Sequence, residues 1–366
     1  MRPQHTEALR AAQGPFVSVY IDDSRDSAEA DGRIEAVWRR LRGDLADSGV
    51  GVVAIAAMEE AILRGTPGAG PQGRGLIATP DGVLVDEHLP AVPRKTVLRV
   101  SEYPYVLPLI GVGRPPYLFA AVDHEGATIT VHHGETVRTE TVDGGGFPVH
   151  KPVSAGWNGY GDLQHSTEEA VRMNVRAVAH RITELVDGIG AEVVFVCGEV
   201  RSRTDVAAAL PSRVVPLVAE LPAGAHGHRA DEEELGDQID AVFTGRRRSQ
   251  LAETMDRLRG EAARESGLAA QGLAAVCGAL RQGDVDTLII GELGDAVVVT
   301  GESRTMVAPD ADVLSEFGEA PCRVVRADEA LPFAAIAVGA TLVSAEDGVS
   351  AADGIAALLR YAPACP

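Results

Sequence analysis

The segment that most constrains this chain is residues 166–185, which predict one long amphipathic helix. Ser166 is followed three residues later by Glu169, the spacing of a capping box at a helix start. The apolar side chains that follow recur on one helical face, at Val171, Val175, Val178, Ile182 and Leu185. Because such an apolar stripe is stable only when it is covered, the helix must pack on another layer of structure.

Strand patterns on both sides of this helix supply that layer. Before it, residues 117–122, 127–131 and 135–142 predict three meandering strands. After it, residues 193–197 predict a buried strand, followed by a short helix over 203–210 and a strand over 214–218. This order predicts a domain with a β-rich start and an αβαβ unit.

The preceding segment predicts a separate domain. Residues 111–116 hold two glycines and two prolines and form the best first boundary. Ahead of it we expect a mixed sheet with two helices, the strands at 16–22, 75–78, 83–85 and 97–100 and the helices at 31–47 and 52–63.

The last third predicts a small α/β sandwich that follows a long charged helix over 229–265. We expect helices at 268–280, 310–317, 330–338 and 355–361, and strands at 287–290, 296–300, 324–325 and 341–343. A length of 366 residues exceeds one ordinary domain. The prediction is therefore an α/β (α+β) protein of three domains, 1–112, 113–240 and 241–366.

Charge limits the partners. With 33 basic and 53 acidic residues the formal charge is −20, which argues against coating DNA, RNA or an anionic membrane through bulk charge. Any RNA contact must be local. Lysine occurs only at Lys95 and Lys151, so arginine, which binds phosphate through a planar fork, carries nearly all positive charge; a GC-rich genome explains the same preference. No run of about 18 apolar residues and no secretory signal pattern occurs, so we expect a cytoplasmic protein.

The common catalytic and metal signatures do not occur. The sequence lacks a GxSxG elbow, a Walker loop, an HExxH motif and a CxxC pair, and we expect neither a metal nor a cofactor. Residues 68–73 match a dinucleotide fingerprint in letters, but a helix precedes them and a strand follows, the reverse of what that fold needs. The four scattered cysteines are expected to be reduced structural thiols.

Histidines and acidic runs also have ordinary interpretations. The pairs His132–His133 and His226–His228 have no visible third ligand, so we expect surface histidines in preference to a metal site. The acidic run at 231–234 is expected to be the first turn of a helix, where carboxylates favour the helix dipole, in preference to a catalytic pair.

One stretch predicts a contact with another molecule, the glycine- and aromatic-rich loop 144–165. Its glycines permit close backbone approach, and two rings offer stacking surfaces for RNA bases. The alternative is a tight connection whose rings pack on their own domain. The candidate rRNA-binding residues are Gly156, Trp157, Asn158, Gly159, Tyr160, Gly161 and His165, with the arginines Arg172, Arg176, Arg201 and Arg203.

The order of strand meander, glycine-rich loop, long helix and αβ unit resembles the middle domain of the archaeo-eukaryotic class I release factor and Pelota superfamily. Residues 14–21 resemble the first strand of that family's N-terminal domain, and residues 283–293 resemble a strand of its C-terminal domain. The loop 156–162, with residues 150–153 before it, is similar to the bacterial Balon-like branch. The resemblance implies a three-domain ribosome hibernation factor, active under stress, that occupies the A site beside EF-Tu.

The sequence departs from that family at its two active motifs. Release factors carry Gly-Gly-Gln at the tip of the middle domain, whereas this loop reads Gly159-Tyr160-Gly161-Asp162, with Gln164 displaced toward the helix. The stop-codon motif Asn-Ile-Lys-Ser does not occur in the first domain either.

We therefore expect a non-catalytic protein that binds the ribosome. Its first domain would enter the decoding centre, its loop would approach the peptidyl-transferase centre, and its third domain would meet EF-Tu. The alternatives are a peptidyl-tRNA hydrolase that rescues ribosomes through Gln164, and an acidic scaffold that binds only proteins.

Overall fold

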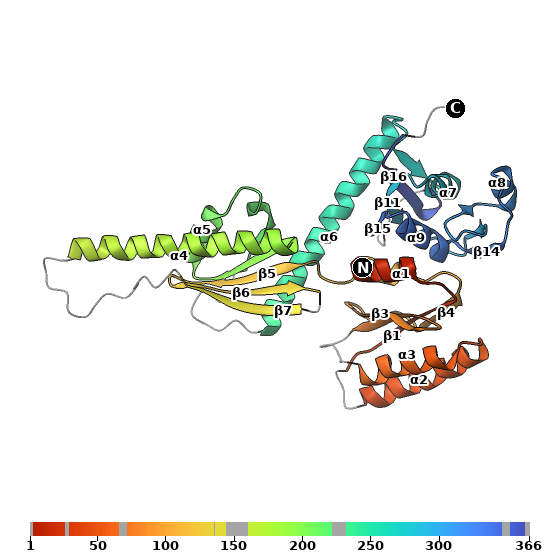
Figure 1. Cartoon of the computed structure of the whole chain (residues 1–366), viewed down its shortest axis with the longest axis horizontal. Helices are drawn as coiled ribbons and strands as arrows, with labels where there is room; N and C mark the ends of the chain where they lie inside the picture. The colour runs from red at the N-terminus through yellow and green to blue at the C-terminus, as the bar shows by residue number, and fades with distance from the viewer. Residues whose placement is uncertain are drawn as a thin grey trace. The chain divides into compact units, whose positions relative to one another are not determined.

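The computed structural model describes residues 3–25, 29–65, 72–134, 136–143, 160–221, 232–345 and 352–362. The chain forms two compact units (Figure 1). Unit 1 combines Met1–Gly113 with Arg248–Pro366, and unit 2 is Arg114–Arg247. The division of unit 1 into separate first and third domains stays a prediction.

The N-terminal part of unit 1 is a sheet with helices on one face. Its strands lie in the order β3-β2-β1-β4, and every neighbouring pair is antiparallel, so the expectation of mixed strand directions is wrong for this sheet. Consecutive strands joined by a tight turn, as β2 and β3 are, can only pair antiparallel. The elements are α1 (Pro3–Ala11), β1 (Phe16–Asp22), α2 (Ala30–Asp47), α3 (Val52–Arg64), β2 (Gly73–Thr79), β3 (Gly82–Leu89), β4 (Val97–Ser101) and η1 (Leu107–Leu109).

The alternation of β1 divides its side chains between two cores. Val17 and Val19 pack with α2 and α3, whose buried side chains include Trp38. Phe16 and Tyr20 point to the opposite face. That face is covered by the C-terminal part of the chain, where Phe333 lies 6.1 Å from Phe16 between ring centroids. One apolar core therefore joins the two sequence-distant parts of unit 1.

The C-terminal part of unit 1 has two small sheets, ordered β10-β16-β11-β15 and β13-β12-β14. Helix α9 lies at the core, with nearly all its side chains buried. The elements are β10 (Ala269–Gln271), α7 (Leu273–Gln282), β11 (Val285–Ile290), β12 (Val297–Thr300), β13 (Val307–Ala308), α8 (Ala311–Glu316), β14 (Arg323–Arg326), α9 (Ala327–Ala337), β15 (Thr341–Ser344), η4 (Ala352–Gly354) and β16 (Ile355–Leu359).

One predicted helix is wrong here, and another begins later than predicted. The terminal helix expected at 355–361 is the strand β16, which lies between β10 and β11 and is buried along its whole length. A short continuous apolar run suits a central strand covered on both faces as well as it suits a helix. The helix expected from residue 268 begins at Leu273, because Gly272 has a φ of +82° and β10 precedes it.

Unit 2 is a five-stranded sheet in the order β7-β6-β5-β8-β9, antiparallel across the meander and parallel from β5 to β9. Helix α4 covers one face with the predicted apolar stripe, and α6, which continues into unit 1, packs on the other. The elements are β5 (Tyr117–Val122), β6 (Gly126–His133), β7 (Thr136–Asp143), α4 (Tyr160–Ile189), β8 (Val193–Gly198), α5 (Val200–Ala209), η3 (Val215–Leu217), β9 (Val218–Glu220) and α6 (Glu232–Ala263).

Two boundaries in unit 2 differ from prediction. Helix α4 begins at Tyr160, six residues before the expected cap at Ser166. The residues between include no proline, and the single Gly161 costs a helix only about 1 kcal/mol. The strand expected at 214–218 begins at Val218, and η3 precedes it, because Pro216 has no N–H to donate to a ladder.

Candidate functional site

The predicted rRNA-binding loop is described only at its C-terminal end. Gly156, Trp157, Asn158 and Gly159 lie outside the described residues. Tyr160, Gly161 and His165 form part of the first two turns of α4. The expectation that the loop continues over residues 160–165 is therefore wrong, because their backbone is helical.

The helical backbone changes what Gln164 can do. Only the first four N–H groups of a helix lack an intrahelical acceptor. Gln164 is the fifth residue of α4, so its N–H is placed to donate to the carbonyl of Tyr160. The glutamine therefore stands on a regular helix, whereas the release-factor motif places its glutamine at the tip of a loop.

Three of the four predicted arginines extend into solvent. Arg172 and Arg176 lie one turn apart on α4, and both are exposed. Arg172 lies 3.6 Å from Glu169, and Arg201 of α5 lies 3.7 Å from Asp205. Such exposed ion pairs are weak, so these guanidinium groups remain available for a phosphate.

Arg203 differs from the other three. Its side chain is buried, and its guanidinium donates to the backbone carbonyl of Leu221 at 2.7 Å. It is therefore occupied inside unit 2, and we remove it from the set of candidate RNA contacts. Its position three residues before the buried Val206, on the same face of α5, was a signal of burial that the sequence already held.

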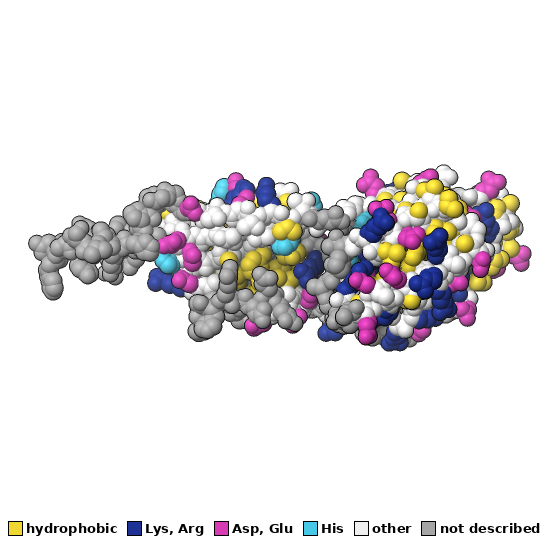
Figure 2. Space-filling model, turned by 90° about the horizontal axis from the view of Figure 1, so that it is seen from below, with side chains coloured by type: hydrophobic (Ala, Val, Ile, Leu, Met, Phe, Trp, Pro, Cys, Tyr) yellow, Lys and Arg dark blue, Asp and Glu magenta, His cyan; other side chains and the backbone are white. Residues whose placement is uncertain are grey.

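Acidic groups surround the arginines of α4. Arg181 donates to both carboxylate oxygens of Glu140 on β7, at 2.5 and 3.0 Å, and also to Glu184 at 3.0 Å. The hydrogen bond from Arg181 lowers the pKa of Glu140, against a smaller opposing effect of burial. Figure 2 shows Lys and Arg side chains interspersed with Asp and Glu on the visible face. Any RNA contact here is local, as the net charge requires.

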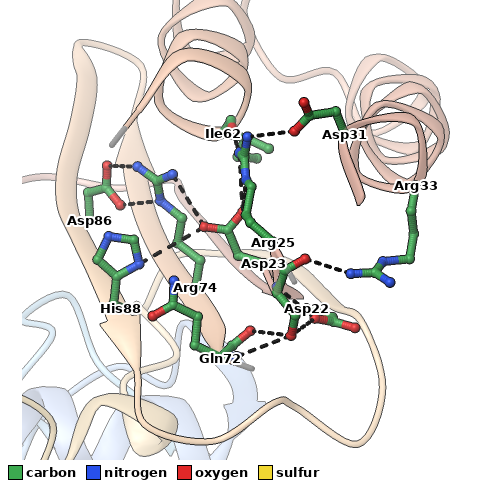
Figure 3. Close-up of polar contacts among 11 residues, drawn as sticks. Asp22, Asp23, Arg25, Asp31, Arg33, Ile62, Gln72, Arg74, Asp86 and His88 are labelled. Carbon is green, nitrogen blue, oxygen red and sulfur yellow. Dashed lines mark hydrogen bonds and ion pairs between the residues drawn. The ribbon is translucent and has the colours of Figure 1, made fainter. Parts of the chain in front are cut away.

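A second polar cluster, which the sequence did not reveal, lies at the end of β1 (Figure 3). Arg74 of β2 donates to both oxygens of Asp86 at 2.7 Å, and its guanidinium lies 3.6 Å from Asp23. Asp23 is fully buried and also accepts from Arg25 at 3.3 Å. We call this the Arg74 cluster. Burial opposes the charge of Arg74, but its hydrogen bonds to Asp86 and the negative charges of Asp86 and Asp23 together outweigh burial and raise its pKa.

The Arg74 cluster joins the segment after β1 to the neighbouring strands and to α3. Arg25 donates to the carbonyl of Ile62 at 3.1 Å, near the end of α3. Ser24 accepts from the N–H of Gln72 at 3.1 Å, and Arg33 donates to the carbonyl of Ser24 at 2.6 Å. These contacts fix backbone. The Ser24 hydroxyl also donates to the carboxylate of Asp22 at 2.6 Å, and His88 lies 4.0 Å from Asp23. Because Ser24 and Asp23 are both buried, we interpret the cluster as structural.

The remaining sequence candidates have ordinary surroundings. His132 is half-buried and stacks on Tyr117 at 4.2 Å, and burial followed by the charge of Arg114 lowers its pKa. His226 and His228 lie outside the described residues. Burial raises the pKa of Cys277 to about 12, as expected of an inert structural thiol. Within the described ranges, no three His, Cys, Asp or Glu side chains are placed to hold a metal, and no helix is long and apolar enough to cross a membrane.

Comparison with solved structures gives low scores. The archaeal translation termination factor aRF1 gives a TM-score of 0.27 and 16% identity, and the alignment covers 97% of this chain and 95% of the aRF1 chain. The model of ribosome-bound archaeal Pelota and ABCE1 gives 0.42 and 13%, with coverage of 99% and 98%. Pelota of Archaeoglobus fulgidus gives 0.36 and 15%, with 79% of each chain covered.

Sequence comparison is more informative. Residues 116–264, from the start of β5 to the end of α6, match the model of bacterial archaeo-eukaryotic release factor family 2. The uncharacterized protein Rv2629 of Mycobacterium tuberculosis H37Rv is 56% identical over 364 residues, covering 99% of this chain and 97% of its own; MT2704 of strain CDC 1551 gives the same values. The chain thus belongs to the archaeo-eukaryotic release factor and Pelota superfamily, in one family with these mycobacterial proteins.

Proposed function

We propose that this protein is a cytoplasmic, Balon-like ribosome hibernation factor that occupies the A site without releasing peptide. The family match covers unit 2 from residue 116 to its end. By the resemblance to release factors, this part of the chain holds the helix and loop that would approach the peptidyl-transferase centre. In this proposal residues 1–112 enter the decoding centre, residues 156–165 approach the peptidyl-transferase centre, and residues 241–366 meet EF-Tu.

The helical backbone at Gln164 is the observation that carries the non-catalytic part of the proposal. Hydrolysis of peptidyl-tRNA needs a water held in line with the ester, and a misplacement of about 1 Å can cost about a hundredfold in rate. In the first turns of α4, Gln164 lacks the flexible double glycine that release factors place before their glutamine. The non-glycine Tyr160 and Asp162 on either side of Gly161 restrict this segment further.

The exposed arginines support a limited electrostatic contact with rRNA. Arg172, Arg176 and Arg201 can each neutralise one phosphate, and each phosphate contact releases about 0.7 to 0.9 of a counterion. We therefore expect the logarithm of the ribosome affinity to fall with the logarithm of salt concentration with a slope of about −2 to −3 from these residues.

The decisive experiment measures peptide release on ribosomes that carry peptidyl-tRNA in the P site. We expect the purified chain to sediment with 70S particles and to release no peptide above the spontaneous rate, and Gln164→Ala to bind as the wild type does. Release that disappears in Gln164→Ala would identify a rescue hydrolase. Failure to sediment with ribosomes in the presence of EF-Tu would identify the acidic scaffold.

A triple variant tests the arginines. Replacing Arg172, Arg176 and Arg201 by Gln should make the slope of the logarithm of ribosome affinity against the logarithm of salt concentration shallower by about 2 to 3. The matched control is Arg213→Gln, because Arg213 is also an exposed arginine of unit 2, paired with Asp187 at 2.7 Å. An unchanged slope in the triple variant would remove these residues from the interface.

A further inference from the structure

Unit 1 contains a hollow between two strands that belong to different sheets. β4 is the last strand of the sheet β3-β2-β1-β4, and β14 is the last strand of the sheet β13-β12-β14. The hollow has a volume of about 560 Å³, within the range of sites that bind ligands. Its lining residues are Lys95, Arg99, Val100, Ser101, Asp295, Val324, Val325, Arg326 and Glu329.

The lining shows that the hollow faces strand edges. Successive side chains of a strand point to opposite faces of its sheet, so a pocket on a sheet face is lined by alternate residues. Here three consecutive residues of β4 (99–101) and three of β14 (324–326) line the same hollow. In the described part of the chain, no backbone hydrogen bond reaches β4 or β14 apart from those to β1 and β12. Each outer edge therefore has free N–H and C=O groups.

Ion pairs hold the two edges at both ends of the hollow. Arg99 donates to Asp328 at 3.0 Å and to Glu329 at 2.8 Å, just beyond the end of β14. Arg323, at the start of β14, lies 3.5 Å from Glu102, just beyond the end of β4. The two strands thus run in opposite directions, and the site has walls held in place before anything binds.

The chemistry of the lining indicates what would bind. Val324 is 68% exposed and Val100 is 37% exposed, so each strand offers an uncovered apolar side chain. Arg99 and Arg326 are already paired with carboxylates. Lys95 is the one lining cation that has no ion pair among the described residues. One end of the hollow therefore favours a negative group.

We propose that this hollow, the β4–β14 groove, binds an extended segment of a partner protein by strand addition. Such a segment carries apolar side chains at alternate positions, to contact Val100 and Val324, and a carboxylate at the end near Lys95. Main-chain hydrogen bonds to a free strand edge give affinity in this mode, and alternate side chains give specificity. The proposal does not depend on ribosome binding, and its test uses no ribosomes.

The experiment selects peptides of 12 random residues, displayed on phage, on the full-length chain. We expect enrichment of peptides with an acidic residue followed by alternating apolar residues. A selected synthetic peptide should lose about tenfold in affinity on Val324→Lys, the value of one buried valine side chain, and about threefold on Lys95→Glu. The matched control is Val53→Lys, an exposed valine of α3 in the same unit, which should leave affinity unchanged.

Backbone methylation of the selected peptide distinguishes strand addition from simple apolar contact. One set of alternate N–H groups of the segment faces β4 and the other set faces β14, so N-methyl groups at either set should abolish binding. Tolerance of N-methyl groups at both sets, or no enrichment over Val324→Lys, would overturn the proposal. A dimer in sedimentation velocity that Val324→Lys abolishes would assign the groove to a second copy and would also overturn it.

Discussion

Two arginines of unit 1 each contact two carboxylates, yet they connect different things. Arg74 joins neighbouring strands of one sheet, with its side chain 3% exposed. Arg99 joins β4 to the start of α9, a sequence separation of 229 residues, with its side chain 22% exposed. Arg99 also lies 3.6 Å from the ring centroid of Tyr105. The comparison separates the effect of burial from the effect of sequence distance on the stability that an ion pair gives.

The largest effect is expected at Arg74. Arg74→Ala leaves Asp23 buried beside an incomplete set of partners and deprives Asp86 of both its hydrogen bonds from Arg74. Removing one partner from a buried ion pair costs about 3–5 kcal/mol of unfolding free energy. Urea unfolding of the full chain measures this loss. Arg74→Lys, which keeps the charge without the planar fork, should recover only part of it.

A loss below about 1 kcal/mol at Arg74→Ala, the value of an exposed pair, would contradict the assignment of the Arg74 cluster as buried structure.

The next effect is expected at Arg99. Arg99→Ala removes three hydrogen bonds to Asp328 and Glu329, but Arg326 still donates to Asp328 at 3.0 Å. Because one partner remains and water reaches the site, we expect a smaller loss of about 2–3 kcal/mol. Hydrogen exchange should show faster exchange of the α9 amides in Arg99→Ala. If Arg99→Ala lowers the free energy of unfolding more than Arg74→Ala does, then joining distant segments contributes more to the stability given by an ion pair than burial does.

Asp328, the partner of Arg99, makes the stability of the fold sensitive to acid. Burial would raise the pKa of Asp328, but hydrogen bonds from Arg326 and Arg99 outweigh burial and lower it below the ordinary value of 3.8. A carboxyl whose pKa is lower in the folded state stabilises the fold above its unfolded pKa. That stability disappears as the pH falls through the folded pKa, in the range below about pH 4.

The measurement compares the pH dependence of urea unfolding for the wild type and Asp328→Asn. We expect the wild type to lose stability more steeply as the pH falls below about 4, because the variant lacks the titrating group. Parallel pH profiles would show that Asp328 has the same pKa in the folded and unfolded chain.

Helices and strands could be predicted from sequence where the spacing of apolar residues was clear. The predictions failed where a helix and a strand share the same apolar pattern. The strand 16–22 and the meander from Tyr117 agree with the structure, because alternation over six or seven residues has one interpretation. The apolar run at 355–359 is compatible with both a helix and a strand. Only its pairing with β10 and β11 shows that it is a strand. The start of α4 was predicted too late, because Ser166 and Glu169 have the spacing of a capping box but lie inside a helix that begins at Tyr160.

The candidate site was predictable only in part, for a different reason. Exposed arginines on α4 follow from the helical period, so Arg172 and Arg176 lie where the sequence placed them. The Arg74 cluster joins Arg74 of β2 and Asp86 of β3 to residues that follow β1. Charge pairs across strands depend on the register of the strands, which no local sequence pattern gives.

The smallest effect on stability is expected at Arg213. This variant tests whether the distance between the charged groups or their exposure to solvent sets the stability that an ion pair contributes. Arg213 and Asp187 of unit 2 are 2.7 Å apart, the same distance as Arg74 and Asp86, but their side chains are 58% and 54% exposed. The hydrogen bond from Arg213 lowers the pKa of Asp187, yet water and salt screen the pair, and two long side chains lose freedom when they form it. We therefore expect Arg213→Ala to leave the urea midpoint unchanged within error, both at about 0.1 M salt and at about 1 M, where screening is nearly complete. Because the two pairs share one distance, a midpoint shift at Arg213→Ala as large as that at Arg74→Ala would show that contact geometry, and not burial, sets the stability of ion pairs in this protein.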